Sequence, residues 1–442
     1  MHCVHGRAAC DGASGKASPP GGGGGRPGGA AEDSNGSGVV QDIYVGRQPI
    51  FDRNFKVVAY ELLARLPGEK QKASDASEAA QVLVHALMDI GLDELTGGHK
   101  VHMNAASGFM LDNIADALPP GRVSFTLMQN TPITGELLDG LKSLREQGYS
   151  IIVDDFVYSP QLEKAIELAD VVRIHYPAVA HCIADEVRQL SRFHVKILVS
   201  GVDDYEAMEV CKPLHIDYFQ GDFFSQPDLV HGKQLSDNKM AVLRALQQVI
   251  SAEAIDEVED VVKQDVALSY RLLKYINSAA FGLKREITSI KQALSLLGLS
   301  NIRRWLSLLS LASLGENKPP ELIKISLVRG KMLELTAALL GYRNQADYFI
   351  LGMFSVLDAL LDRPMKEALE DIALPQSVRD GLLVPDSEMG KLLTIVRFIE
   401  HNDWQQAEAA CLVIPDLNAH LLMQQYLQAI RWADEQMRSL GL

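Results

Sequence analysis

The feature that most constrains how this chain folds is an alternation of short apolar runs and amphipathic segments between residues 43 and 227. The apolar runs predict strands over residues 56–60, 101–104, 123–127, 150–154, 171–174, 196–200 and 218–220. The amphipathic segments predict helices over residues 77–90, 134–147, 159–168, 183–193 and 204–210. Strands that alternate with helices indicate βα units and a parallel sheet. Seven or eight such units in fewer than 200 residues predict a compact TIM-like α/β barrel.

The second half of the chain has a different character. From about residue 235 the strand-like runs end, and apolar residues recur at helical spacing, as in Val258, Val262, Leu272 and Ile276. This pattern predicts an all-α domain over residues 235–430, after a barrel domain over residues 42–232. Residues 1–41 are rich in Gly, Ser and Pro, and we expect a disordered tail there.

Charge and composition exclude several classes of function. The formal net charge is −15, which argues against broad DNA binding and against docking on an anionic membrane. The sequence has no apolar run long enough for a transmembrane helix and no apolar leader segment. The five cysteines show no C-x-x-C spacing, which is typical of reduced thiols in the cytosol. We therefore expect a cytoplasmic protein with no membrane partner.

Three polar residues stand where strands of the predicted barrel end. Glu61, Asn104 and Asp154 each close an apolar run, and the carboxyl ends of barrel strands face the ligand. Carboxylate and amide oxygens suit hard cations such as Mg²⁺ or Mn²⁺. The alternative is that these side chains cap strand ends or shape turns.

A series of short motifs extends this interpretation. The motifs are Gln48-Pro49-Ile50, Glu61-x-Leu63-x-Arg65, Asn104, Asp154-Asp155-Phe156 and the run from Gln220 to Pro227. Their order and spacing resemble those of EAL domains, the cyclic-di-GMP phosphodiesterases. The resemblance covers residues 43–227 and implies a vestigial metal site formed by Glu61, Asn104, Asp154 and Asp155. It also implies ligand contacts from Gln48, Arg65 and Gln220.

Other positions depart from the EAL pattern. A metal-binding Glu of that family is replaced by Thr126, and the family Lys that positions the attacking water is replaced by Arg173. A metal-binding Asp becomes His175, and a further site carboxylate becomes Ser200. Arg stays protonated far above neutral pH, so it cannot exchange a proton as that Lys would. We therefore expect no catalytic residues. No cofactor is certain, and Mg²⁺ or Mn²⁺ is the cation expected if the remaining ligands still hold a metal.

The helical half carries a second resemblance. The segments 269–282 and 286–298 resemble the signature of HDOD domains, which are similar to metal-dependent HD phosphohydrolases without their metal residues. At the positions of a His-Asp pair this chain has Ser355 and Val356. His401 is interpreted as part of a helix end. We expect Tyr275 and Trp305 to pack in the core, with a ligand box as the alternative.

Together the two halves resemble bacterial EAL–HDOD signalling proteins of the YuxH type, a group associated with motility, biofilm formation and cyclic-di-GMP networks. The leading hypothesis is a catalytically inactive adaptor that acts through a signalling protein partner. A divergent but active phosphodiesterase and a nucleotide-independent scaffold are the alternatives. Binding of cyclic-di-GMP, the identity of the partner and an oligomeric state stay open.

Overall fold

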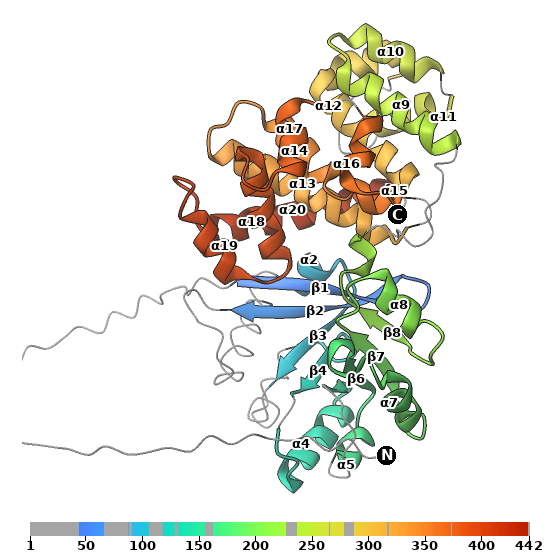
Figure 1. Ribbon diagram of the computed structural model, residues 1–442, viewed down its shortest axis with the longest axis vertical. Helices are drawn as coiled ribbons and strands as arrows, with labels where there is room; N and C mark the ends of the chain where they lie inside the picture. Colours follow the sequence, from blue (N-terminus) through green and yellow to red (C-terminus); the bar gives the residue numbers. More distant parts are fainter. Residues whose placement is uncertain are drawn as a thin grey trace, which may run out of the picture. The chain divides into compact units, whose positions relative to one another are not determined.

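Eight strands close a barrel in sequence order (Figure 1). The computed structural model describes residues 44–65, 87, 91–105, 118–128, 131–154, 162–226, 237–264, 266–277, 287–315, 318–372 and 374–440. The expected tail, Asp155 and nearly all of the expected helix over residues 77–90 lie outside them. The strands are β1 (Tyr44–Asp52), β2 (Val57–Arg65), β3 (Lys100–Ala105), β4 (Val123–Leu127), β5 (Ser150–Val153), β6 (Val171–His175), β7 (Lys196–Ser200) and β8 (Tyr218–Gln220).

The barrel differs in one respect from the wholly parallel sheet expected from the sequence. Strand β1 pairs antiparallel with both β2 and β8, while the other neighbouring strands are parallel. A tight turn joins β1 to β2, and in that turn Asp52 Oδ1 accepts the N–H groups of Asn54 and Lys56. A turn this short can connect only antiparallel strands.

Side-chain alternation along the strands sets up layers inside the barrel. Ile50, Ala59, Ile152, Val171 and Leu198 form a separate apolar cluster contributed by five strands. The side chains of a strand alternate between its two faces, so residues two positions further along lie on the same inner face. The next layer along β2, β5 and β6 is therefore polar, and it contains the candidate site.

The helices around the barrel are short. They are α2 (Leu92–Thr96), α4 (Gly135–Glu146), α5 (Glu163–Ile166), α6 (Tyr176–Val179), α7 (Ile183–Leu190) and α8 (Tyr205–Cys211), followed by the 3₁₀ turn η2 (Phe223–Ser225). Thr134 precedes α4 and its side chain accepts the N–H of Leu137, and Asp204 precedes α8 and accepts the N–H of Ala207. The expected helices over residues 134–147, 183–193 and 204–210 are confirmed, and α5 covers part of residues 159–168.

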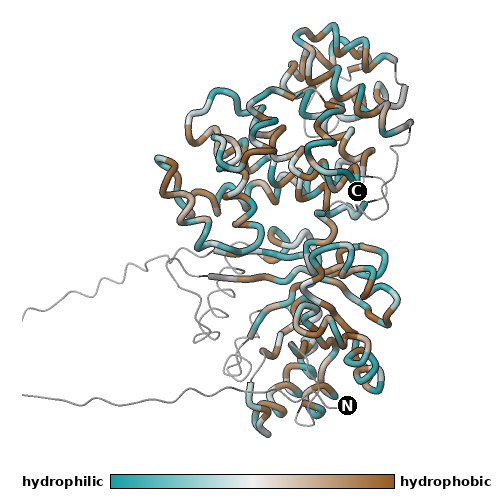
Figure 2. The backbone as a smooth tube through the Cα atoms, viewed as in Figure 1, coloured by the Kyte–Doolittle hydropathy of each residue, from teal (hydrophilic) through white to brown (hydrophobic). Residues whose placement is uncertain are grey.

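Every regular element described after residue 236 is helical. These elements are α9 (Asp237–Ser251), α10 (Ile255–Gln264), α11 (Val266–Ile276), α12 (Ile290–Leu314), α13 (Pro320–Leu339), α14 (Gln345–Phe354), α15 (Leu357–Leu361), α16 (Met365–Ala368), the 3₁₀ turn η4 (Leu369–Asp371), α17 (Gln376–Leu383), α18 (Glu388–Glu400), α19 (Trp404–Cys411) and α20 (Ala419–Leu440). Along these helices apolar and polar stretches alternate at short range (Figure 2). None of the described helices is both long and apolar enough to cross a membrane.

The helices pack around two hydrophobic cores. Helices α9 to α12 enclose one core that includes Val258, Leu272 and Trp305. The later helices share a larger core with the outer face of the barrel, where Trp404 of α19 stacks on Tyr44 of β1 at a ring-centroid distance of 4.5 Å. Helix α12 contributes to both cores. It is kinked at Gly298, where φ is 74°.

Candidate functional site at the centre of the barrel

The polar layer of the barrel is built by strand register. Glu61 lies two residues after Ala59 on β2, and Arg173 lies two residues after Val171 on β6. Asp154 directly follows β5, where its N–H donates to Leu127 O at 3.1 Å. Across the β1–β2 hairpin Gln48 faces Glu61, and Ile50 faces Gln220 of β8. Barrel closure thus brings together side chains that are far apart in sequence.

Arg173 occupies the centre of this layer. Its Nε and Nη2 donate to the two carboxylate oxygens of Asp154, each at 2.5 Å. Its Nη1 donates to Glu61 Oε1 at 2.7 Å. The side chains of all three residues are less than 10% exposed. One guanidinium therefore bridges two buried carboxylates, in the planar two-pronged geometry that Arg favours.

The remaining oxygen of Glu61 is also engaged. Gln220 Nε2 donates to Glu61 Oε2 at 2.6 Å and to Gln48 Oε1 at 2.9 Å. Both oxygens of Glu61 and both oxygens of Asp154 accordingly accept hydrogen bonds from protein donors. The structure thus joins five of the residues singled out from the sequence in one network.

Electrostatics keep this network charged. Burial alone would lower the pKa of Arg173, but the charges and hydrogen bonds of Glu61 and Asp154 outweigh burial and raise that pKa. His102 is next to Glu61 in the β2–β3 register and is fully buried. Burial, with the nearby charge of Arg173, lowers the pKa of His102 to about 3. At neutral pH His102 is therefore uncharged, and Arg173 supplies the positive charge beside the two carboxylates.

The positions at which the EAL pattern is lost flank this network. Thr126 of β4 is fully buried beside Asn104 of β3, and neither Thr126 Oγ1 nor Asn104 Oδ1 has a hydrogen-bond partner among the described residues. His175 and Ser200 face each other across β6 and β7, with Nδ1 and Oγ 3.4 Å apart. His175 is exposed, so it lies at the rim of the barrel.

Two predicted site residues cannot be placed in the network. Arg65 is the last residue of β2, but its side chain lies outside the described part of the chain. Asp155 is outside it entirely. Their roles as a ligand contact and as a metal ligand stay predictions.

The side chains of the polar layer can be compared with the ligands that divalent cations require. The described residues contain no cluster of three or more His, Cys, Asp and Glu side chains that could hold a metal ion. Glu61 and Asp154 are suitable oxygen ligands, but Arg173 is already paired with both of them at hydrogen-bond distance. With Thr126 in place of a further ligand, these residues do not fit a pair of divalent cations.

The helical half has no second metal site at the expected position. Ser355 and Val356 are buried, and Ser355 Oγ accepts a hydrogen bond from Arg329 Nη1 at 3.1 Å. Arg329 also pairs with Glu400 through its Nε at 2.9 Å. This position therefore belongs to a buried ion pair of the helical core. Elsewhere in the helical half, Tyr275 stacks on Trp305, and both pack in the first helical core, as expected.

Sequence reasoning missed the contacts between the barrel and the helices. Tyr60 precedes Glu61 and points to the opposite face of β2, where its hydroxyl donates to Glu321 of α13 at 2.9 Å. Lys324 Nζ donates to the same hydroxyl at 3.2 Å and pairs with Asp434 of α20 at 2.5 Å. The guanidinium of Arg47 lies over the Tyr60 ring at 4.8 Å. A strand-end motif gives no signal for contacts on the outer face of its own strand.

A histidine provides a further link. His401 ends α18, and its Nδ1 donates to Arg397 O at 2.7 Å while its Nε2 donates to Asp222 Oδ2 at 2.6 Å. A histidine donates from both ring nitrogens only when it is protonated. The hydrogen bond to Asp222 is the main cause that raises the pKa of His401 to about 9. The helix-end interpretation of His401 is confirmed, and the contact with the barrel is new.

Comparisons with known proteins identify the class. The EAL domain family matches residues 41–227, and the HDOD domain family matches residues 237–370. The protein YuxH of Bacillus subtilis is 31% identical over 404 residues, which cover 88% of this chain and 98% of YuxH. The chain belongs to this family of EAL–HDOD proteins, with an EAL-type barrel followed by a helical HDOD domain. CdgJ of Vibrio cholerae, named a cyclic di-GMP phosphodiesterase, is 29% identical over 406 residues, 89% of this chain and 92% of CdgJ.

Solved structures are similar to this chain at lower levels. An EAL domain protein from Listeria monocytogenes EGD-e is 18% identical with a TM-score of 0.34, over 41% of this chain and 87% of that one. The manganese/cy-diGMP complex of Klebsiella pneumoniae BlrP1 at pH 9.0 is 20% identical with a TM-score of 0.35, over 41% and 55% of the two chains. At these scores the likenesses carry no inference about a ligand.

Proposed function

We propose that this protein is a signalling adaptor in a cyclic-di-GMP network, with a barrel that has lost the phosphodiesterase reaction. The observation that carries the proposal is the guanidinium of Arg173 between Glu61 and Asp154. A hydrolytic EAL barrel would need these carboxylates for cations that activate water and stabilise the leaving oxygen. Here a guanidinium, which cannot activate water as a bound cation does, bridges them instead.

The hydrogen bonds of Arg173 oppose an incoming cation. A hydrogen bond to a charged group contributes roughly 1.5–3 kcal/mol, and Arg173 makes three of them. A cation that took its place would break all three and leave a guanidinium buried without a partner. Each ~1.4 kcal/mol corresponds to a tenfold change in affinity, so several powers of ten oppose metal uptake at this position.

Binding of cyclic-di-GMP without hydrolysis belongs to the same proposal. Gln48 is partly exposed, so its amide can form hydrogen bonds with a ligand, whereas Gln220 is buried and its Nε2 already donates to Glu61 and Gln48. Arg65 remains the residue that the family resemblance assigns to ligand phosphate. Because Arg173 already supplies a cation, we expect any binding of the dinucleotide to be independent of added Mg²⁺ or Mn²⁺.

Calorimetry combined with product analysis tests this function. We would titrate the full chain with cyclic-di-GMP in Mg²⁺, in Mn²⁺ and in EDTA, and follow nucleotide products by chromatography. The adaptor proposal predicts no sustained turnover in any buffer and the same binding isotherm in all three. Sustained product formation that Glu61→Ala abolishes would overturn it.

A divergent but active phosphodiesterase is the second candidate, and similarity to CdgJ, which is named a cyclic di-GMP phosphodiesterase, favours it. This candidate predicts turnover that requires added metal and is lost in Glu61→Ala. The third candidate, a scaffold that does not bind nucleotide, predicts no heat of binding with cyclic-di-GMP. It also predicts that Arg65→Ala leaves binding of a protein partner unchanged.

The identity of that partner is not encoded in the site. Since the formal net charge is −15, we place the adaptor among protein partners rather than on DNA or on a membrane surface. Self-association is a further open part of this proposal. Light scattering of the purified chain at several concentrations measures it directly.

A further inference from the structure

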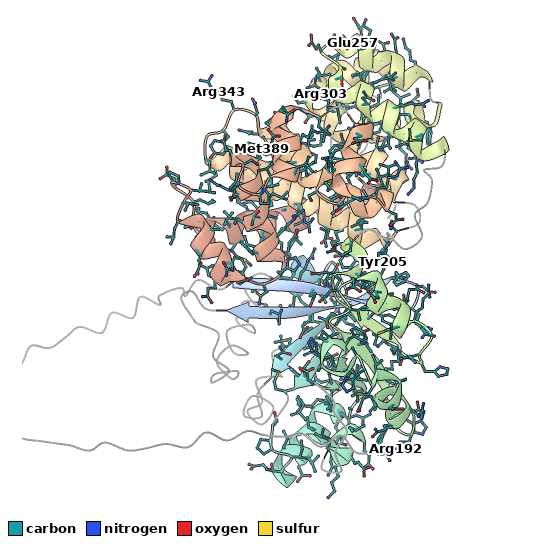
Figure 3. The ribbon with its side chains drawn as sticks, viewed as in Figure 1. Arg192, Tyr205, Glu257, Arg303, Arg343 and Met389 are labelled. Atoms are coloured by element: carbon teal, nitrogen blue, oxygen red, sulfur yellow. The ribbon has the colours of Figure 1, made fainter. Side chains whose placement is uncertain are left out.

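A small pocket opens where the two helical cores meet. Its volume is 180 Å³, and its lining comes from three helices. Tyr275 belongs to α11, Asn301, Arg304 and Trp305 to α12, and Trp432 and Gln436 to α20. Figure 1 shows α9, α10 and α11 grouped around the first part of α12, before α12 passes into the second core. Arg303, labelled in Figure 3, marks this stretch of α12.

Aromatic rings form the walls of this pocket. Tyr275 and Trp305 stack on each other with centroids 5.7 Å apart and planes 26° apart. Trp432 reaches the pocket from α20 and meets Phe349 edge to face at 5.7 Å. Flat aromatic walls favour a flat occupant, because stacked and edge-on ring contacts stabilise more than burial alone.

Three polar side chains share the lining with these rings. Arg304 pairs with Glu334, and the same carboxylate accepts Lys331 Nζ at 2.9 Å, so two cations share one anion. The Nε of Arg304 is buried and has no hydrogen-bond partner among the described residues. Because this buried Nε has no accessible surface, Arg304 lines the pocket through its other atoms. The amides of Asn301 and Gln436 add groups that can form hydrogen bonds with the edge of a ring.

The pocket is too polar for a simple packing gap and too small for a dinucleotide. Empty cavities in proteins are lined by apolar side chains, whereas Arg304, Asn301 and Gln436 line this one. Pockets for drug-sized ligands measure roughly 300–1,000 Å³, so 180 Å³ suits a single ring system.

We propose that this pocket binds a planar heteroaromatic ring with hydrogen-bond acceptors on its edge, of the size of a nucleobase. The ring lies among Tyr275, Trp305 and Trp432, with its acceptor edge toward the guanidinium of Arg304. The site lies in the helical half and goes beyond the function proposed for the barrel, because it does not depend on Glu61, Arg173 or any metal.

Tryptophan fluorescence gives a direct test, because Trp305 and Trp432 are two of the three tryptophans in the chain. We would titrate the full chain with guanosine and with adenosine. The proposal predicts saturable quenching by at least one of them. Emission that stays constant, or that falls linearly into the millimolar range with both nucleosides, would overturn it.

Two variants locate the site. Gln436→Phe fills the pocket and should abolish the saturable quenching, whereas Gln424→Phe, on the exposed side of the same helix, should leave it unchanged. Circular dichroism confirms that both variants are folded. If Gln436→Phe does not fold, Arg304→Lys replaces the fork of donors by one ammonium and should weaken binding about tenfold. Unchanged affinity in the folded variants would contradict the assignment.

Discussion

Arg173 contacts two strands at once because a guanidinium directs N–H groups to more than one side. Two of these groups meet Asp154 after β5, and a third meets Glu61 on β2. A lysine is a compact point charge and cannot make this set of parallel bonds. At the scale of one residue, the chemistry of the barrel therefore depends on the shape of the cation as much as on its charge.

Arg173→Ala should destabilise the protein, because it leaves two carboxylates buried side by side without their cation. Breaking a buried pair in this way costs about 3–5 kcal/mol. Urea denaturation measures the loss, and Mn²⁺ should restore part of it in the variant while leaving the wild type unchanged. Arg192→Ala is the matched control, since the Arg192–Glu163 pair is exposed and should contribute less than ~1 kcal/mol. Equal losses in the two variants would contradict the bridging role of Arg173.

The sequence identified the members of this network but not their contacts. Glu61 and Asp154 were found as strand-end oxygens, and Arg173 was found as a departure from the family motif. That Arg173 bonds both carboxylates depends on barrel closure, which joins positions 112 residues apart. Local spacing carries no information about such a contact.

At the scale of elements, the β1–β2 hairpin has two working faces. Gln48 and Glu61 face each other on its inner side and contact Gln220. Arg47 and Tyr60, one residue earlier on each strand, meet on the outer side. Since neighbouring residues of a strand alternate between faces, the hairpin joins the polar centre of the barrel to helices α13 and α20.

Tyr60→Phe should destabilise the contact between hairpin and helices. The hydroxyl of Tyr60 bonds Glu321, which is 6% exposed, and its loss leaves a buried carboxylate short of a donor. The expected cost is about 1–3 kcal/mol in the free energy of unfolding. Tyr270→Phe removes the same group from a side chain that is 66% exposed, and its effect should be close to zero. A Tyr60→Phe protein as stable as the wild type would show that this hydroxyl contributes nothing.

Gly46→Ala should also weaken this face of the hairpin. A Cβ at Gly46 would lie 2.8 Å from Asn402 Oδ1, and that oxygen is held by a hydrogen bond from Trp404 Nε1. Overpacking of this kind typically costs about 1–3 kcal/mol, seen as a lower melting temperature. A Cβ at Gly135, at the start of α4, would have no atom within 4 Å, so Gly135→Ala should instead stabilise the protein by about 0.4–1 kcal/mol. A stabilised Gly46→Ala variant would argue against tight packing here.

Strand β1 shows the limit of reading elements from sequence. The parallel strands stood out as continuous apolar runs, as buried strands do. In β1 the segment Arg47-Gln48-Pro49 interrupts the apolar run. Arg47 contacts Tyr60 on the outer face, Gln48 belongs to the inner polar network, and the strand pairs antiparallel with β2. Its two functional faces made the strand hard to recognise.

At the scale of the whole molecule, ion pairs join the barrel to the helices. His401 of α18 pairs with Asp222, and Arg431 of α20 pairs with Glu94 of α2. The Nζ of Lys318 lies over the ring of Tyr205, labelled in Figure 3, at 5.5 Å from the ring centroid. The alternation of strands and helices predicted the barrel and helical spacing predicted the all-α half, but only the tertiary structure shows that they share a hydrophobic core.

The His401–Asp222 pair predicts a pH dependence of stability. The pKa of His401 is raised from 6.5 to about 9, so its contribution is complete below pH 6.5 and is lost as pH rises through 9. Urea denaturation at pH 6, 7.5 and 9.5 should therefore show a wild-type advantage over Asp222→Asn that disappears at the highest pH. A difference that stays constant across these three values would contradict the ion pair.

Anomalous diffraction from crystals grown in Mn²⁺ tests the central claim most directly, because it locates the metal and Arg173 in one experiment. We predict that the guanidinium of Arg173 lies between Glu61 and Asp154 and that no manganese peak is within bonding distance of either carboxylate. A manganese ion coordinated by Glu61 and Asp154, with Arg173 turned away, would contradict the account and favour an active phosphodiesterase.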